Sequence, residues 1–259
     1  MSEPYRLPDI HRVSLAAPLV WLQAGFNDLK RAPGPCLAYG FGLTLLSLAI
    51  TAVLYVTGQF TWFLVLAGGF MIIAPMLGLG LYRAASMLEK GEMPTLGAML
   101  STLFTPRADG FLLGVALFVL FGIWAEAAYI IYGLSTFQVH QSVVDFLGFL
   151  LLTPEGWQMA LIGSCIGGVI AFIAFALVVV SAPMMLEEGS DAFLAVITSV
   201  RSVLANLPAM LVWAFLITLL TALGMALMMI GLVIVFPWIG LSSWHAYRHL
   251  VLHTSPLAG

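Results

Sequence analysis

The stretch that decides the fold begins at Asp191, ends at Trp244 and reads DAFLAVITSVRSVLANLPAMLVWAFLITLLTALGMALMMIGLVIVFPWIGLSSW. Its first part, Asp191–Pro208, places small or polar side chains at i, i+3, i+4 and i+7 and bulky apolar ones opposite them: Thr198, Arg201, Ser202 and Ala205 against Phe193, Ile197, Val200, Leu204 and Leu207. This spacing predicts an amphipathic helix lying in a membrane interface. Asp191 is suited to cap its start.

The second part, Ala209–Trp244, contains no charged side chain. As one helix it would measure roughly 54 Å, nearly twice the hydrocarbon thickness of a bilayer, about 30 Å. A turn near Leu223 and Gly224, which divides the run into two spans, is therefore favoured over one long helix.

The composition of the whole chain excludes an ordinary soluble domain. Of its 259 residues, 62% are hydrophobic and 8% are charged, whereas soluble domains carry about 25% charged residues. The apolar runs are continuous, as in membrane helices, and do not alternate as barrel strands do. The sequence therefore predicts an all-α polytopic membrane helix bundle with six transmembrane helices: Cys36–Val56, Trp62–Tyr82, Phe111–Leu134, Met159–Val180, Val203–Ala222 and Met225–Trp244.

The basic residues predict the orientation of these spans. All 9 Lys and Arg residues fall before the first span, in alternate loops or after the last span, so they lie on one side. By the positive-inside rule that side is cytoplasmic, together with both termini. We expect residues 1–18 and 251–259 to be cytoplasmic tails and residues 19–250 to form a single membrane domain. No basic cluster is dense enough to bind nucleic acid.

The chain also shows a threefold pattern, in which an interfacial segment precedes each hairpin of two spans. The predicted units are residues 19–92, 93–190 and 191–250. Leu88-Glu89-Lys90-Gly91 matches Leu186-Glu187-Glu188-Gly189, and the segment 75–82 resembles 237–244. Shared membrane constraints are the alternative to a true duplication. Parallel repeats differ from the inverted repeats common in secondary transporters, which weakens a transporter interpretation.

The C-terminal third carries a resemblance to a known family. Asp191-Ala192-Phe193 through Asn206-x-Pro208, then Gly231 to Gly240 and Trp244-His245-Ala246-Tyr247-Arg248, resemble a bacterial family of integral membrane proteins of unknown function, domain of unknown function 2189. The resemblance is expected to cover about residues 20–250. It implies a bacterial inner-membrane location and supplies no activity. Some members are labelled cytochrome c oxidase.

Histidine positions argue against a catalytic oxidase subunit. A haem-copper core needs several histidines deep within its helices, and none of the 5 histidines lies within a predicted span. His245 and His249 could share a metal by their spacing. The favoured interpretation is that Trp244, His245, Tyr247 and Arg248 form an aromatic and basic collar at anionic headgroups. The sequence predicts no metal or other cofactor.

Two acidic residues complete the candidates. Glu126 is the only ionisable residue well inside a span, about 24 Å along the helix from Gly110. It could serve a relay, contact a partner, or bond to Tyr129 or Tyr132. Asp28 is expected near the cytoplasmic surface, where it could form salt pairs between units.

These features favour a non-catalytic protein that assembles, stabilises or accompanies another membrane protein or complex, with a respiratory complex among the candidates. The alternative is a small transporter or lipid-handling protein with a cavity near Glu126. An intramembrane enzyme is the least favoured class, because no nucleophile and base pair in the sequence.

Overall fold

The computed structural model describes residues 7–59, 62–104, 108–137, 140 and 143–252. The parts of the predicted tails at residues 1–6 and 253–259 lie outside this range. The elements are β1 (Asp9–Ile10), α1 (Ala17–Arg31), α2 (Pro33–Val56), α3 (Trp62–Leu77), α4 (Leu79–Glu89), α5 (Leu96–Phe104), α6 (Ala108–Ser135), α7 (Val143–Leu152), α8 (Pro154–Val178), α9 (Ser181–Glu188), α10 (Ala192–Ala205), α11 (Leu207–Ala226), α12 (Leu232–Leu250) and β2 (Val251–Leu252).

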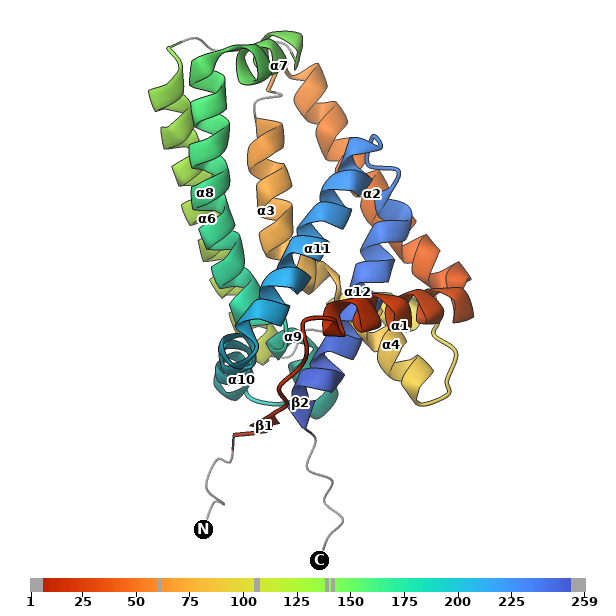
Figure 1. Ribbon diagram of the computed structural model, residues 1–259. Coiled ribbons are helices and arrows are strands. Elements are labelled where there is room, and N and C mark those ends of the chain that lie inside the picture. Colours follow the sequence, from red (N-terminus) through yellow and green to blue (C-terminus); the bar gives the residue numbers. More distant parts are fainter. Residues whose placement is uncertain (1–6, 60–61, 105–107, 138–139, 141–142, 253–259) are drawn as a thin grey trace, which may run out of the picture.

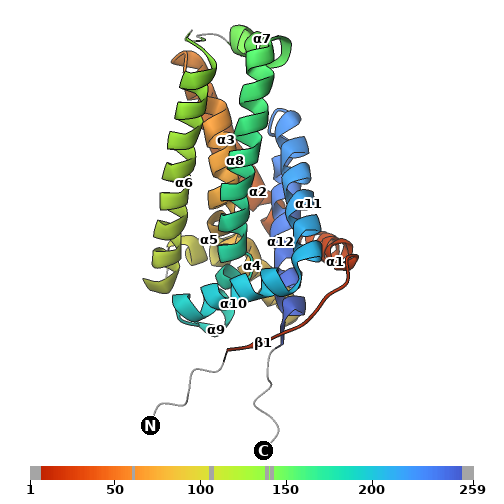
Figure 2. The same ribbon diagram turned by 60° about the vertical axis from the view of Figure 1, so that its left-hand side comes forward.

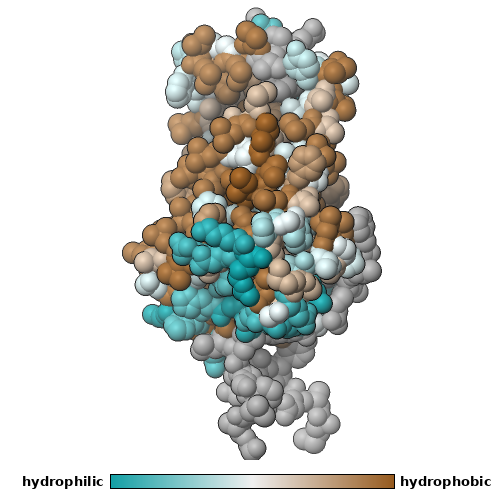
Figure 3. Space-filling model, turned by 90° about the vertical axis from the view of Figure 1, so that its right-hand side faces the viewer, coloured by the Kyte–Doolittle hydropathy of each residue, from teal (hydrophilic) through white to brown (hydrophobic). Residues whose placement is uncertain are grey.

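The predicted helix bundle is present, with fewer established spans than expected. Five segments in the described chain are long and apolar enough to cross a membrane: Pro33–Val56, Trp62–Glu89, Asp109–Ser135, Pro154–Glu187 and Leu207–Ala226. The prediction of six spans in three hairpins is therefore not confirmed. Upright helices fill the upper part of the molecule in Figure 1. Their outer surface is predominantly hydrophobic, and polar residues gather toward the lower end in Figure 3.

The last apolar run consists of two helices, and the break between them lies later than expected. α11 ends at Ala226, and Met228 and Met229 take left-handed backbone conformations, with φ of 51° and 63°. α12 then begins at Leu232. The predicted position of this turn, near Leu223 and Gly224, is wrong because α11 continues through both residues. α12 is not one of the five segments that are long and apolar enough to cross a membrane. Its second half carries Ser242, Ser243 and other polar residues.

Short helices lie across the lower end, where the sequence predicts interfacial segments. α1 and α10 run crosswise to the upright helices in Figures 1 and 2. The Asp191 carboxylate accepts a hydrogen bond from the Leu194 amide, as expected of a cap. On α10, Thr198 and Ser202 are buried, whereas Phe193 and Leu204 are exposed. The predicted faces are therefore kept only in part, since Arg201 and Ala205 are also exposed and Val203 is buried.

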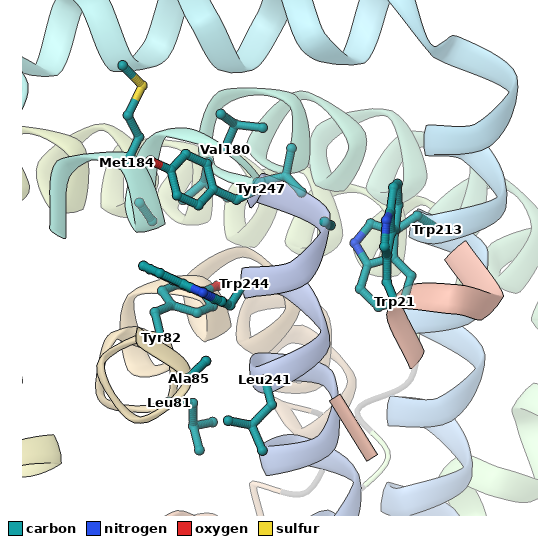
Figure 4. Close-up of a cluster of buried hydrophobic side chains, with 14 of the residues drawn as sticks. Trp21, Leu81, Tyr82, Ala85, Val180, Met184, Trp213, Leu241, Trp244 and Tyr247 are labelled. Atoms are coloured by element: carbon teal, nitrogen blue, oxygen red, sulfur yellow. The ribbon is translucent and has the colours of Figure 1, made fainter. Parts of the chain in front are cut away.

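α12 is the centre of the core. It packs against α1, α2 and α4, which come from the first third of the chain. Close approach depends on glycines: a Cβ on Gly25 would collide with the backbone of Ser242, and one on Gly240 with Leu81. Figure 4 shows Trp244 beside Tyr82 in this core, and Trp21 beside Trp213. The rings of these two tryptophans meet edge to face, with centroids 5.7 Å apart.

The two ends of the chain are joined at the lower end of the molecule. β1 and β2 pair antiparallel, with Asp9 opposite Leu252 and Ile10 opposite Val251. The Asn206 side chain accepts a hydrogen bond from the Val13 amide and donates one to the His11 carbonyl. The described part of the predicted N-terminal tail is therefore bound to the body of the protein.

Candidate functional site

Five of the six candidate residues come together at the lower end of α12. Trp244, His245, Tyr247 and Arg248 lie on its last two turns, and Asp28 reaches them from α1. Glu89 from the end of α4 and Glu187 from α9 complete the group. We call these seven residues the α12 cluster.

Arg248 joins two carboxylates from separate parts of the chain. Its Nη2 lies 2.9 Å from Glu89 Oε1, and its Nη1 lies 3.1 Å from Glu187 Oε1. The side chains of Arg248, Glu89 and Glu187 are 32%, 42% and 20% exposed, so water screens Glu187 the least. A planar guanidinium has enough donors to bind two carboxylates at once, which a lysine ammonium does less well.

The aromatic members bind the same two carboxylates. Trp244 Nε1 donates to Glu89 Oε2 at 2.9 Å, and the Tyr247 hydroxyl donates to Glu187 Oε2 at 2.8 Å. Trp244 is 1% exposed and Tyr247 is fully buried. The prediction of a collar at the lipid headgroups is therefore wrong for these two residues. Their rings fill the core between α4, α9 and α12, and their polar atoms donate hydrogen bonds to the two glutamates.

Asp28 and His245 form the other half of the α12 cluster. Asp28 Oδ2 lies 2.7 Å from His245 Nε2, and Asp28 Oδ1 lies 3.4 Å from Arg31 Nη1. Asp28 is buried, although the sequence places it at the surface. Arg31 Nη2 also donates to the Leu88 carbonyl at 3.3 Å. These contacts connect α1 to both α12 and α4.

Glu89 and Glu187 were paired by the repeat pattern, and the structure gives them equivalent roles. Each lies at the end of a helix that is followed by a glycine in the left-handed region, Gly91 with φ of 78° or Gly189 with φ of 61°. Glycine adopts this conformation without strain and so ends a helix readily. Both glutamates then bind Arg248.

Glu126 lies apart from the α12 cluster. It is exposed on α6, nine positions before the helix ends at Ser135, which is about 14 Å along the axis. No described residue forms a hydrogen bond or ion pair with it. The two suggested tyrosine partners do not bind it: Tyr132 bonds to His140 at 2.9 Å, and Tyr129 is 65% exposed.

Sequence reasoning missed a histidine contact next to the α12 cluster. His249 Nδ1 accepts a hydrogen bond from Nε1 of the buried Trp21 at 3.0 Å. The His11 ring lies edge to face with His249, at 5.4 Å between centroids. Burial and the neighbouring His11 both lower the pKa of His249. His245 and His249 thus have different partners, Asp28 and Trp21, and no group of three metal-binding side chains occurs in the described chain.

The Trp21 contact should depend on pH. Because the pKa of His249 is lowered in the folded protein, folding favours the neutral ring, and stability should fall as the pH drops below about 6.5, its ordinary value. Protonated Nδ1 cannot accept the tryptophan hydrogen bond. We expect the melting temperature and the tryptophan emission to change together between about pH 7 and 5. His249→Asn keeps an acceptor without a titrating group, so its melting temperature should lose most of this dependence. An unchanged pH profile in this variant would contradict the assignment.

Comparisons with known proteins agree with a membrane location. Residues 63–187 match the model of a family described as predicted integral membrane protein, DUF2189. The match is shorter than the expected residues 20–250, and the C-terminal motif that suggested the family lies outside it. No curated protein and no solved structure shows a significant match to the chain. The resemblance to this family of integral membrane proteins of unknown function is thereby confirmed over residues 63–187.

Proposed function

We propose that this protein is non-catalytic and binds another membrane protein or complex through the face of α6 that carries Glu126. The observation that carries the proposal is the position of this carboxyl group, which is exposed within an apolar span and has no described hydrogen-bonding partner. An ionisable group at the centre of a membrane helix costs about 2.5–3.5 kcal/mol on insertion scales, and less toward the interface. A partner helix that bonds to the carboxyl would offset this cost.

The surroundings of Glu126 suit a second helix. Gly122 lies one turn before it and Gly133 two turns after it, on the same face of α6. A Cβ on either glycine would meet nothing within 4 Å. Small residues allow two helix backbones to approach closely in a membrane. The exposed glycines and the carboxyl together form a face that a helix from a partner can cover.

The α12 cluster supports a structural role for the lower end. Its acidic, basic and aromatic polar groups bind one another, and they connect α1, α4 and α9 to α12. Groups held in such mutual bonds suit positioning more than turnover. A transporter built on Glu126 requires this carboxyl to face a cavity. It is exposed instead, and Glu126 is not among the residues that line a cavity found between α4, α5, α6 and α9 at the lower end.

Gentle solubilisation of tagged protein, followed by native electrophoresis and mass analysis, tests the proposal. The wild type should migrate in a larger particle whose other component the mass analysis identifies, with a respiratory complex as one candidate. Glu126→Leu should release the protein from that particle without lowering its melting temperature, because no described internal bond is lost. Glu126→Gln, which can still hydrogen-bond, should retain part of the association.

Gly42→Leu is the matched control, since Gly42 is also exposed in a span, with nothing within 4 Å of a Cβ, but lies on α2. It should leave the particle intact. Migration of the wild type only as a free monomer would contradict the proposal. Loss of a solute flux in Glu126→Gln, with association unchanged, would favour the transporter alternative.

We infer that the protein lies in a bacterial inner membrane with both termini in the cytoplasm. The described helices that carry basic residues, α1, α4, α10 and α12, meet at the lower end, where β1 and β2 also pair (Figure 1). A C-terminal reporter that is active only in the cytoplasm tests this orientation, and a C-terminal tag accessible from the periplasm would overturn it.

A further inference from the structure

A cavity of about 340 Å³ opens at the lower end between α4, α5, α6 and α9. Its lining includes one basic and one acidic residue, Arg83 on α4 and Asp109 on α6. Both are half-buried. Neither forms an ion pair with the other or with any residue that the structure describes. The fold therefore holds two opposite charges apart in one cavity.

The two charges differ in how far the protein already compensates them. Asp109 Oδ1 accepts a hydrogen bond from the amide of Ala192, the first residue of α10, at 3.3 Å, whereas Oδ2 has no described partner. The hydroxyls of Ser101 and Thr102, which also line the cavity, donate to the Ala98 carbonyl. Among the described residues, none accepts a hydrogen bond from the Arg83 guanidinium, and none binds Asp109 Oδ2. Charges that are partly removed from water and lack a described partner are costly, which favours a ligand that bonds to both.

The cavity walls change from charged to apolar residues between the lower end and the interior. Going up α6, Asp109 is followed one turn later by the buried Leu113. Going up from Arg83 through α4 into α3, Leu79 and then Met76 line the cavity. Both walls are therefore charged at the lower end and apolar toward the interior of the bundle, as a lipid bound by its headgroup requires.

We propose that this cavity binds a zwitterionic phospholipid with a primary ammonium headgroup. Arg83 binds the phosphate, Asp109 Oδ2 accepts from the ammonium, and the acyl chains leave along Met76 and Leu113. A guanidinium matches the phosphate geometry, and an ammonium supplies the donors that a carboxylate accepts. The site is separate from the Glu126 face and does not rest on the proposed function.

Lipid titrations of the purified full-length protein in detergent test the proposal, with the melting temperature as the readout. Dioleoyl-phosphatidylethanolamine should reach half of its effect at a concentration about fivefold below those of the phosphatidylcholine and phosphatidylglycerol analogues, which lack the ammonium donors. A fivefold difference corresponds to about 1 kcal/mol, the order of one net hydrogen bond in water. Equal effects of the three lipids would overturn the ammonium contact. Phosphoethanolamine alone should not compete at similar concentrations, and competition would identify a soluble ligand instead of a lipid.

Variants separate this site from general attraction between basic residues and lipid. Arg83→Gln should weaken binding of phosphatidylethanolamine about tenfold. Asp109→Asn, whose side-chain oxygen can still accept from the Ala192 amide, should weaken it to the level of the phosphatidylglycerol analogue. Arg201→Gln removes the same charge from the exposed face of α10 and should change binding less than about twofold. Equal losses in Arg83→Gln and Arg201→Gln would overturn the site. Gly110→Leu, which fills the cavity and leaves both charges in place, should also block binding.

Discussion

Replacing Gly40 by alanine should lower the free energy of unfolding by about 1–3 kcal/mol, because α2 could no longer approach α12. A Cβ at this position would lie 2.7 Å from Pro237 Cγ and against the Val233 carbonyl oxygen. A proline ring inside a helix and a backbone carbonyl have little freedom to move. The predicted loss would appear as a lower midpoint in thermal or detergent denaturation.

Gly42→Ala is the control, two residues along the same helix. Nothing lies within 4 Å of a Cβ there, so the helix should be unaffected or stabilised by about 0.5–1 kcal/mol through alanine's better helix propensity. If the two alanines shifted the midpoint equally, the close packing of α2 on α12 would be refuted.

The second large effect is expected from Arg248→Ala. This change leaves the Glu89 and Glu187 carboxylates close together without their shared cation. Breaking a fully buried ion pair costs about 3–5 kcal/mol, and the partial exposure of these groups reduces the expected cost to about 1–3 kcal/mol. Arg248→Lys should recover only part of the loss, since an ammonium is less suited to bridging two carboxylates. Thermal denaturation in detergent measures both variants.

The two glutamates should contribute unequally. Glu187 is 20% exposed and also accepts from Tyr247, whereas Glu89 is 42% exposed and accepts from Trp244. Glu187→Ala should therefore destabilise more than Glu89→Ala. In double-mutant cycles, each glutamate variant should show a coupling free energy with Arg248→Ala, because Arg248 binds both carboxylates. Additive effects across the cycle would show that Arg248 does not couple to these carboxylates.

Local signals predicted much of the fold. The sequence predicts a helix that begins after Asp191, and α10 begins there. Continuous apolar runs also predict the long helices α2, α6 and α8 within a few residues. Each of these features depends on neighbours in the chain, where helix period, caps and the length needed to cross a bilayer act directly.

The arrangement of the candidate site could not be predicted in the same way. Glu89 and Arg248 are far apart in sequence, and no local pattern indicates that α4 and α12 lie side by side. Trp244 and Tyr247 resemble an interfacial collar because aromatic residues near basic ones are common at membrane surfaces. Their burial depends on glycines such as Gly25 and Gly240, which admit neighbouring elements that the sequence alone does not identify.

The packing of α1 on α12 constrains how the chain reaches its native state. α1 is made long before α12, the helix against which it mainly packs. Until α12 is complete, Asp28 lacks His245 and Trp21 lacks His249. The N-terminal strand waits still longer, since its partner β2 follows α12. The packing of α1 in the core must therefore wait until α12 has been made, although the two helices lie at opposite ends of the membrane domain in sequence.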